Sequence, residues 1–434
     1  MKHNVKIVAI GAGSYVFGPG VLAGILQTHR LNGAEVALVD IDEEMLQGML
    51  GVGRRLADEA GTDATLSAHT GWDEPMDGAD FVICSAAPQL RERFAADCGI
   101  IQRLLPQHVI TEFGGVAGLS YSARQIAFME TIAESMRRRC PQAWFLTVSN
   151  PLPRTCQAMH EMGIRTAGFC SAALEGYSML WHLFEGENIR FPFQEARDRW
   201  EVTMGGLNHF SWVLGLRDRR TGEDLLGEVR ERLEKGASSA WPHSDEISRR
   251  VGYLMVPNDH HTQDFLPPRP NAVNRGHASH GNEDQRRERI ETLRAVGSRQ
   301  LPLETVTGRV SWEKPVDMIA GLVCGQVASF EALNLSNGSE QASGLPEQVF
   351  VETPAEVAAS GPVPQALEIP PRVLDLLRPA AQQSDRIVKA CLRRDREALL
   401  DCVEQEPTIL DKSGGRVALA ECLEAHADLI GEWR

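Results

Sequence analysis

The sequence lacks the long apolar runs and paired cysteines that mark membrane-spanning and disulfide-stabilised proteins. Its apolar runs are short and interrupted by charge, so none is long enough to cross a bilayer. The first residues enter a strand-like run without the basic and apolar regions of a secretory signal, and we expect a cytoplasmic protein. The nine cysteines are odd in number and scattered without a Cys-x-x-Cys pair, which favours reduced thiols over a disulfide framework.

An excess of positive charge is also missing, since the formal net charge is -15. Such a surface repels nucleic acid and anionic membranes, so we expect neither as a partner. A local basic pocket for an acidic substrate is still compatible with this charge. At 434 residues, of which 43% are hydrophobic, the chain exceeds the size at which one core stops growing. We therefore expect two domains, at residues 1–198 and 199–434.

Strand-like and helical segments alternate in the first half of the chain. The strand-like runs lie at 5–10, 35–39, 80–84 and 144–148, and the segments of helical period at 19–29, 43–58 and 122–139. This alternation predicts an α/β fold, with a Rossmann-type, doubly wound parallel sheet in the first domain.

After Cys170 the pattern predicts a mixed α+β domain. Residues 200–218 alternate as antiparallel strands do, and helical periods occur at 223–235, 244–253, 314–324 and 371–403. The polar stretch at 257–287 is expected to be an active-site or interface loop, and 335–366 a connector punctuated by glycine and proline. The exposed loop and the apolar C-terminal helices favour a homodimer or homotetramer.

A glycine-rich turn, Gly11-Ala12-Gly13-Ser14, follows the first apolar run. Glycines let the backbone turn sharply and approach a pyrophosphate, and Asp40, at the end of the next apolar run, can accept hydrogen bonds from an adenosine ribose. This carboxylate favours NAD over NADP. The third glycine of the Gly-x-Gly-x-x-Gly pattern is replaced by Val16, so an ordinary strand-turn-helix is the alternative interpretation.

Asn150 closes a strand at the carboxyl edge of the predicted sheet, where such folds bind ligands. It faces the nicotinamide or the substrate, or else it only ends the strand in a turn. Glu112, followed by Gly114 and Gly115, leads into a helix that contains Arg124, so the Glu112 carboxylate and the glycine amides can face the same cleft.

Cys170 and His209 each lie in or after a strand-like run and offer a thiol and an imidazole, which together can hold a divalent metal. The alternative is that both are buried structural residues. The segment 252–265 combines Tyr253, Asp259 and His261, and these are general acid–base groups unless the segment is a solvated loop.

In order along the chain, these motifs resemble those of glycoside hydrolase family four, the NAD- and metal-dependent glycosidases. The shared segments are the Gly-x-Gly-Ser turn and Asp40, Arg91 and Arg93, and residues 112–115, 149–151, 168–170, 206–212, 259–265, 333–338, 345–346 and 351–355. The ordered set is more specific than any one motif. The resemblance implies NAD and a divalent metal, manganese, as cofactors.

The resemblance also implies roles for individual residues. It makes Cys170 and His209 metal ligands and Asn150 and Asn208 sugar contacts. The expected NAD contacts are Gly11, Gly13, Ser14, Phe17, Asp40, Ser85 and Asn150. The expected partners of an acidic substrate group are Arg91, Arg93 and Arg124. The expected catalytic residues are His261, Asp259 or Tyr253 as the base and Glu112 as the acid.

The chain departs from the family pattern at three places. Ser171 follows the cysteine where His or Asp is common, Asp264-Phe265 replaces Glu-Tyr, and the first Gly-Gly segment lacks its Thr-Gly-Pro lead. These changes indicate a divergent member, near the α-galacturonidases or the related NAD-dependent sulfoquinovosidases. We therefore expect an α-glycoside with an anionic C6 group as the substrate, with 6-phosphoglycosides as the alternative.

The resemblance implies hydrolysis by transient oxidation at C3 of the sugar, loss of the C2 proton, elimination of the aglycone and addition of water, an exception to the two-carboxylate scheme. Two other functions fit the same motifs. One is a dehydrogenase of the lactate/malate type, which shares the Gly-rich turn and the Ser-Asn-Pro run. The other is a catalytically silent NAD-binding regulator, which the absence of an acid at Ser171 suggests.

Overall fold

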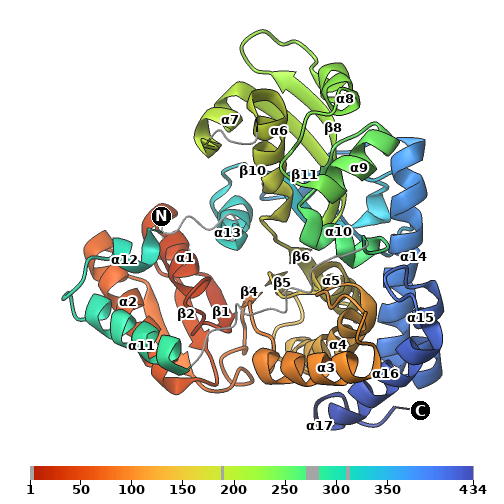
Figure 1. Ribbon diagram of the computed structural model, residues 1–434. Coiled ribbons are helices and arrows are strands. Elements are labelled where there is room, and N and C mark those ends of the chain that lie inside the picture. Colours follow the sequence, from red (N-terminus) through yellow and green to blue (C-terminus); the bar gives the residue numbers. More distant parts are fainter. Residues whose placement is uncertain (1–3, 187–189, 270–282, 309–312, 434) are drawn as a thin grey trace.

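The computed structural model describes residues 4–186, 190–269, 283–308 and 313–433. A twelve-stranded sheet runs through this part of the chain, with helices packed along it (Figure 1). Its strands are β1 (Lys6–Ile10), β2 (Glu35–Val39), β3 (Thr65–His69), β4 (Phe81–Cys84), β5 (Trp144–Thr147), β6 (Arg165–Gly168), β7 (Trp200–Leu207), β8 (Phe210–Asp218), β9 (Met255–Val256), β10 (Ala328–Ser336), β11 (Phe350–Ala358) and β12 (Gly361–Pro364).

Helices follow most of the strands. They are α1 (Gly18–Ala23), continued by a π-helix (Gly24–Thr28), α2 (Glu43–Ala60), α3 (Leu90–Leu104), α4 (Gly115–Arg139), α5 (Leu152–Glu161), α6 (Glu175–Glu185), α7 (Phe193–Arg199), α8 (Leu226–Glu234), α9 (Pro242–Val251), α10 (Asp259–Phe265), α11 (Glu283–Gly297), α12 (Glu304–Thr307), α13 (Pro315–Cys324), α14 (Pro371–Arg393), α15 (Arg396–Gln405), α16 (Lys412–Ala425) and α17 (Ala427–Ile430). No helix in the described ranges combines the length and apolar character that crossing a membrane requires.

The strand order confirms the predicted Rossmann-type α/β fold. Strands β3-β2-β1-β4-β5-β6 are neighbours in that order and all pair in parallel. This is the 3-2-1-4-5-6 order of a doubly wound dinucleotide-binding sheet. The four predicted strands correspond to β1, β2, β4 and β5, and the strand-like run before Cys170 is β6, whereas β3 was not among the predicted runs.

Strands of the second half extend the same sheet in antiparallel fashion, in the order β6-β10-β11-β7-β8-β9. The predicted antiparallel pair at 200–218 is the hairpin of β7 and β8. Helix α11 packs on α2, and α14 packs on α4 and α5 (Figure 1). Because the sheet and these helices join the two halves, the division at 198/199 stays a prediction.

Two expectations about irregular segments were wrong. The expected connector at 335–366 contains the end of β10 and all of β11 and β12. Pro354 interrupts the apolar pattern of β11, and the ladder with β10 is irregular opposite it, between Phe330 and Leu333, where a residue without an N–H is tolerated. The expected loop at 257–287 begins with α10, whose first turn is capped by the Asn258 side chain, and ends in α11. Residues 270–282 of that loop lie outside the described ranges.

The parallel strands place several motifs at one edge. Gly11 follows β1, Ser85 follows β4, Asn150 lies shortly after β5, and Cys170 lies just beyond β6. Carboxyl ends of parallel strands meet at the same edge of a sheet, so residues far apart in the sequence come together there. The two-residue turn of the β7–β8 hairpin, Asn208-His209, is brought to this edge by the pairing of β6, β10, β11 and β7.

Candidate active site

The glycine turn after β1 is closely packed against the next strands. Gly11 has a φ of +81°, and a Cβ there would lie 2.9 Å from Ser85 Oγ. A Cβ on Gly13 would lie 2.8 Å from Asp40 Oδ2, the atom that accepts a hydrogen bond of 2.8 Å from the Gly13 N–H. Burial raises the pKa of Asp40 against its backbone hydrogen bonds. Only glycine therefore leaves the surface of this turn open to a ligand.

A pocket of about 840 Å³ runs along this turn. The pocket is lined by several of the residues expected to contact a dinucleotide or an acidic group, namely Gly11, Gly13, Ser14, Asp40, Ser85, Arg91 and Arg124. Phe17 lies in a second pocket that shares Ser85 with the first. Helix α11 adds Arg286, which is paired with Asp42, and Arg289, which lies over the Tyr15 ring.

The three arginines expected to bind an acidic group have different surroundings. Arg93 donates two hydrogen bonds to the carboxylate of Asp428, of 2.8 and 2.5 Å. Arg124 is buried and donates from Nη1 to Asp97, whereas its Nη2 is buried without a hydrogen-bond partner in the described structure. Arg91 lines the large pocket beside Arg124. Arg93 and Arg124 are thus both paired with carboxylates, and Arg124 and Arg91, but not Arg93, line the pocket.

Cys170 and His209 meet at the carboxyl edge of the sheet. The Cys170 Sγ lies 3.4 Å from His209 Nε2, although the residues are 39 positions apart in the sequence. His209 has a φ of 64°, and its ring packs on Phe113 with the centroids 4.4 Å apart. The unusual backbone and the packing direct Nε2 of the imidazole at the thiol.

Burial shifts the pKa of both groups. It raises the pKa of the Cys170 thiol to about 12, with the nearby Glu352 carboxylate adding to the effect. It lowers the pKa of His209 well below the usual value, and His261 contributes in the same direction. The imidazole is therefore neutral, as metal binding requires, whereas the thiol needs a cation beside it to lose its proton.

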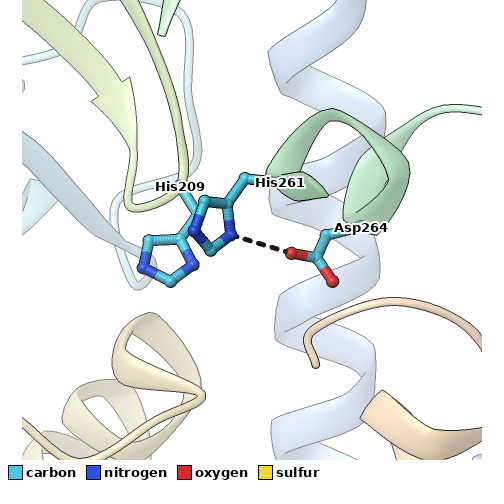
Figure 2. A group of neighbouring side chains, drawn as sticks. All are labelled: His209, His261 and Asp264. Carbon is cyan, nitrogen blue, oxygen red and sulfur yellow. Dashed lines mark hydrogen bonds and ion pairs between the residues drawn. The ribbon is translucent and has the colours of Figure 1, made fainter. Parts of the chain in front are cut away.

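His261 on α10 lies against His209, with the ring centroids 3.9 Å apart (Figure 2). Its Nδ1 is 3.2 Å from Oδ2 of the buried Asp264, and Figure 2 shows this contact as the link between the two side chains. Burial lowers the pKa of His261, but the hydrogen bond and charge of Asp264 outweigh it, with Glu112 and Glu175 adding to them, so the pKa is raised. His209, His261 and Asp264 lie close enough to form a metal-binding group.

Asp264 also holds the segment that carries Glu112. Its Oδ1 accepts hydrogen bonds from the backbone N–H of Phe113, at 2.8 Å, and of Gly114, at 3.3 Å. A Cβ on Gly114 would lie 2.1 Å from the backbone oxygen of Asp264, so the close approach of these two segments requires glycine. Oδ1 is thus held by the backbone and Oδ2 lies beside His261 Nδ1, so Asp264 fixes the orientation of the His261 ring.

The structure places the other two predicted bases away from His209. The Asp259 carboxylate accepts hydrogen bonds from the backbone N–H groups of His243, at 3.0 Å, and Ser244, at 2.8 Å, and so caps the start of α9. The Arg230 guanidinium group of α8 lies over the Tyr253 ring, with its Cζ 5.4 Å from the ring centroid. Of the three sequence candidates, only His261 is in ring contact with His209.

Glu112 and Asn150, which are 38 positions apart in the sequence, are joined by a hydrogen bond. The Asn150 Nδ2 donates to Glu112 Oε1 at 2.8 Å. The structure thus brings the end of β5 to the segment before α4, two features that the sequence analysis did not link. The charge of Glu112 also contributes to the raised pKa of His261, so the Glu112–Asn150 pair influences the charge state of the histidine pair.

The fully buried carboxylate of Glu352 supports the residues behind the site. Its Oε1 accepts hydrogen bonds of 3.0 Å from Asn208 and from Asn334, and its Oε2 accepts one of 2.8 Å from Ser211. In the sheet, Asn334 pairs with Gly168 and with Glu352, which in turn pairs with Gly206.

The paired residues Gly168, Asn334, Glu352 and Gly206 form a row that crosses four strands directly behind Cys170 and His209. The sequence contained Glu352 only as part of a shared motif, and its pairing partners could not be read from it. A carboxylate directly after the apolar residues Phe350 and Val351 was the available signal.

The Glu352→Leu substitution is expected to lower the midpoint of thermal unfolding by several degrees. It leaves the amides of Asn208 and Asn334 buried without their acceptor, and each such loss costs about 1–3 kcal/mol. Glu352→Gln should lose less, because the Ser211 hydroxyl can accept a hydrogen bond from the new amide. The exposed Glu356 on the same strand provides the control variant Glu356→Leu, and equal midpoints for the two leucine variants would contradict the assignment.

Comparison with known proteins places both halves of the chain in one family. Residues 6–181 match the model of family 4 glycosyl hydrolases, and residues 204–409 match that of their C-terminal domain. An α-galacturonidase of Lachnoclostridium phytofermentans is 24% identical over 450 residues, covering 95% of this chain and 94% of that protein.

An α-glucosidase of Erwinia rhapontici is 34% identical, over 58% of this chain and 54% of that protein. An α-galactosidase of Bacillus subtilis is 28% identical, over 60% of this chain and 59% of that protein. These two alignments therefore span little more than half of the relatives' length.

Two solved structures share the fold over almost the whole chain. A 6-phospho-α-glucosidase from gut microorganisms, in complex with NAD and Mn²⁺, has a TM-score of 0.75 and 20% identity and covers 100% of both chains. A 6-phospho-β-glucosidase from Thermotoga maritima, with manganese, NAD⁺ and glucose-6-phosphate, has a TM-score of 0.75 and 18% identity, covering 98% of this chain and 99% of the other. The two family models, which together match most of the chain, show that this chain belongs to family 4 of the glycosyl hydrolases.

Proposed function

We propose that this protein hydrolyses α-glycosides with an anionic C6 group, such as galacturonides or sulfoquinovosides, with NAD and a divalent metal, manganese, as cofactors. The observation that carries the proposal is the approach of Cys170 to His209 beside the His261–Asp264 pair. The relatives named α-galacturonidase, which align over nearly the full chain, support the anionic group.

The donors present fit a divalent cation. Cys170 and His209 would hold it, since the thiol and the imidazole nitrogen already lie 3.4 Å apart in a buried setting. Asn208 Oδ1 is buried without a hydrogen-bond partner in the described structure, as expected for a group that awaits a ligand. Hydroxyl groups of the sugar would supply further oxygen ligands.

The glycine turn likewise fits a dinucleotide. Gly11, Gly13, Ser14, Asp40 and Ser85 line a pocket of about 840 Å³, and Cβ atoms at the two glycines would lie 2.9 Å from Ser85 Oγ and 2.8 Å from Asp40 Oδ2. When bound, NAD supplies a reversible acceptor for the hydride at C3 of the sugar, and the metal supplies a Lewis acid for the sugar oxygens.

His261 is the residue that we propose takes the C2 proton. Asp264 holds its Nδ1, so the ring is oriented with Nε2 available to accept a proton. Removal of that proton allows the bond between C1 and the aglycone to break by elimination. Asp259 has its carboxylate engaged in capping α9, and Tyr253 lies under Arg230, which makes both weaker candidates.

The sugar is proposed to be held by asparagines and arginines. Asn208 is fixed by Glu352 and presents a free Oδ1 to a hydroxyl group, while Asn150 is fixed by Glu112. The acidic C6 group is assigned to Arg124 and Arg91, which line the large pocket. An arginine matches a carboxylate or sulfonate through paired N–H donors.

Gly13→Ala is expected to weaken NAD binding by about 5- to 150-fold, because the added methyl group would lie 2.8 Å from Asp40 Oδ2 and would force the turn or the carboxylate to move, at about 1–3 kcal/mol. Titration calorimetry with NAD measures this change. Gly99→Ala on α3 is the control, since Gly99 has a helical backbone and a Cβ there meets no atom within 4 Å. Equal NAD affinity of wild type and Gly13→Ala would contradict the assignment of the turn.

The function is tested with a panel of 4-nitrophenyl glycosides. It contains α and β anomers of neutral, uronic, sulfonated and 6-phosphorylated sugars, assayed with NAD and Mn²⁺ and again after chelation. The α-uronide or α-sulfonate is expected to be hydrolysed, with deuterium from D₂O at C2 of the product. Hydrolysis that persists without NAD, or a product without deuterium at C2, would overturn the proposed route.

The same panel separates the alternatives. The solved neighbours are named 6-phosphoglucosidases, so preference for the phosphorylated members would assign that substrate class instead. Net formation of NADH with substrate would indicate a dehydrogenase, and NAD binding without aglycone release would indicate a regulator.

We further propose that the protein is a cytoplasmic homodimer or homotetramer with domains at 1–198 and 199–434. Light scattering tests the oligomeric state, and limited proteolysis tests the domain boundary.

A further inference from the structure

A third pocket, of about 450 Å³, opens beside the paired histidines. Cys170, His209 and His261 form one side of it, and Phe191 and Phe193 contribute aromatic rings. Its remaining lining residues in the described structure are Ser171, Ala172, Leu174, Glu175 and Ser178. Glu175 is the single carboxylic acid among these lining residues.

Glu175 is held in place by the segment that carries His261. It is the first residue of α6, five positions after Cys170. Its Oε2 accepts a hydrogen bond of 2.9 Å from Asn258 Nδ2, and Asn258 also caps the start of α10 with its Oδ1. One asparagine side chain therefore fixes both the carboxyl group of Glu175 and the helix on which His261 lies.

The setting of Glu175 favours its protonated form. Burial raises the pKa of its carboxyl group, and the hydrogen bond from Asn258 and the charge of His261 only reduce this effect. Glu112, which the sequence suggested as the acid, accepts a hydrogen bond from Asn150 and is not among the residues that line this pocket.

We propose that Glu175 is the general acid that protonates the departing aglycone oxygen, and that the aromatic side of the same pocket receives the aglycone. This inference rests on the proposed function, since it assigns a residue to one step of that reaction. Elimination leaves the electron pair of the C1–O bond on the aglycone oxygen, and an alkoxide is a poor leaving group without a proton. Glu175 and His261 line the same pocket, so an acid and a base are available to one sugar.

The proton balance closes over one turnover. In the elimination, His261 takes the C2 proton, the C1–O bond breaks and a proton moves from the Glu175 carboxyl group to the aglycone oxygen. In the hydration, water adds its oxygen to C1 and gives a proton back to the Glu175 carboxylate, while His261 returns a proton to C2. No oxidant or reductant enters either step, so the acid is restored without another reactant.

The test compares leaving groups in the NAD- and Mn²⁺-loaded enzyme. The substrates are 4-nitrophenyl and methyl α-galacturonide, or the same pair for the sugar that the glycoside panel selects. A nitrophenolate leaves without a proton, whereas methoxide does not. Glu175→Gln is therefore expected to lower kcat/KM for the methyl glycoside by about 100-fold or more and for the nitrophenyl glycoside by less than about 5-fold. Exchange of the C2 hydrogen with D₂O should persist in this variant.

Three further variants make the assignment falsifiable. Glu175→Asp keeps an acid and should recover part of the hydrolysis of the methyl glycoside. Glu185→Gln, the same substitution at the exposed last residue of the same helix and outside the lining of this pocket, should change both substrates little. Glu112→Gln tests the rival acid, and selective loss of the methyl glycoside there would transfer the role to Glu112.

Equal losses for both substrates in Glu175→Gln, or loss of C2 exchange in this variant alone, would overturn the proposal. Absence of C2 exchange in the wild-type enzyme would instead reject the proposed function.

Discussion

Replacement of Cys170 by alanine is expected to lower kcat/KM for the best glycoside about 1,000-fold or more. The thiol and His209 Nε2 lie 3.4 Å apart and are the two protein donors proposed for the metal. Loss of one of them removes Lewis-acid stabilisation worth several kcal/mol, and each 1.4 kcal/mol corresponds to tenfold in rate. Cys170 is not part of the glycine turn that is proposed to bind NAD, so the affinity for NAD should change little.

Three measurements on Cys170→Ala separate metal loss from misfolding. Bound manganese is measured by elemental analysis after dialysis, NAD binding by calorimetry and the fold by thermal unfolding. Cys98→Ala serves as the control because Cys98 is a partly exposed thiol on α3. Retention of both manganese and activity in Cys170→Ala would show that the metal is held elsewhere, for example by the His209, His261 and Asp264 group.

The Rossmann half could be predicted because its signals are local. Buried parallel strands read as short apolar runs, and a glycine turn between a strand and a helix has a narrow structural meaning. The helical period predicted at 43–58 corresponds to α2, whose first turn is capped by Asp42 and which ends at Gly61 in the left-handed region. Strand β3 was missed because its side chains are only partly buried and one end of it is polar.

The second half was harder to predict because its strands are defined by distant partners. Nothing in the local sequence says that Asn334 pairs with Gly168 or that Glu352 pairs with Gly206. The glycine- and proline-rich surroundings of β11 favoured a connector, whereas the ladder with β10 made it a central strand.

The site shows the same division between local and distant information. Cys170, His209 and His261 were identified as reactive residue types, and the structure brings all three together. Their supports were not identified, since Asp264 acts through the backbone N–H of Phe113, 151 positions away, and Glu352 through Asn208, 144 positions away. Asp259 has the same side chain as Asp264 but caps a helix, so residue type alone cannot separate a positioning carboxylate from a structural one.

Asp264→Asn is expected to lower kcat by about 100- to 10,000-fold with little change in the KM for the glycoside. The carboxylate accepts from His261 Nδ1 at 3.2 Å, which leaves Nε2 free to accept a proton. An asparagine amide directed at the same nitrogen would donate to it, and the proton of the ring would then reside on Nε2, where it blocks the base. The substitution preserves the size of the side chain, so the packing around Phe113 should survive.

The pH dependence gives this prediction a second readout with a definite sign. The Asp264 carboxylate raises the pKa of His261 because it stabilises the charged imidazole. Without that charge the pKa falls, so the acid limb of kcat in Asp264→Asn should move to lower pH than in the wild type.

The comparison variant Asp259→Asn, on the same helix, weakens only the cap of α9. It should lower the midpoint of thermal unfolding and leave kcat little changed. If Asp259→Asn loses activity and Asp264→Asn keeps it, the base is Asp259 and the assignment of His261 is wrong.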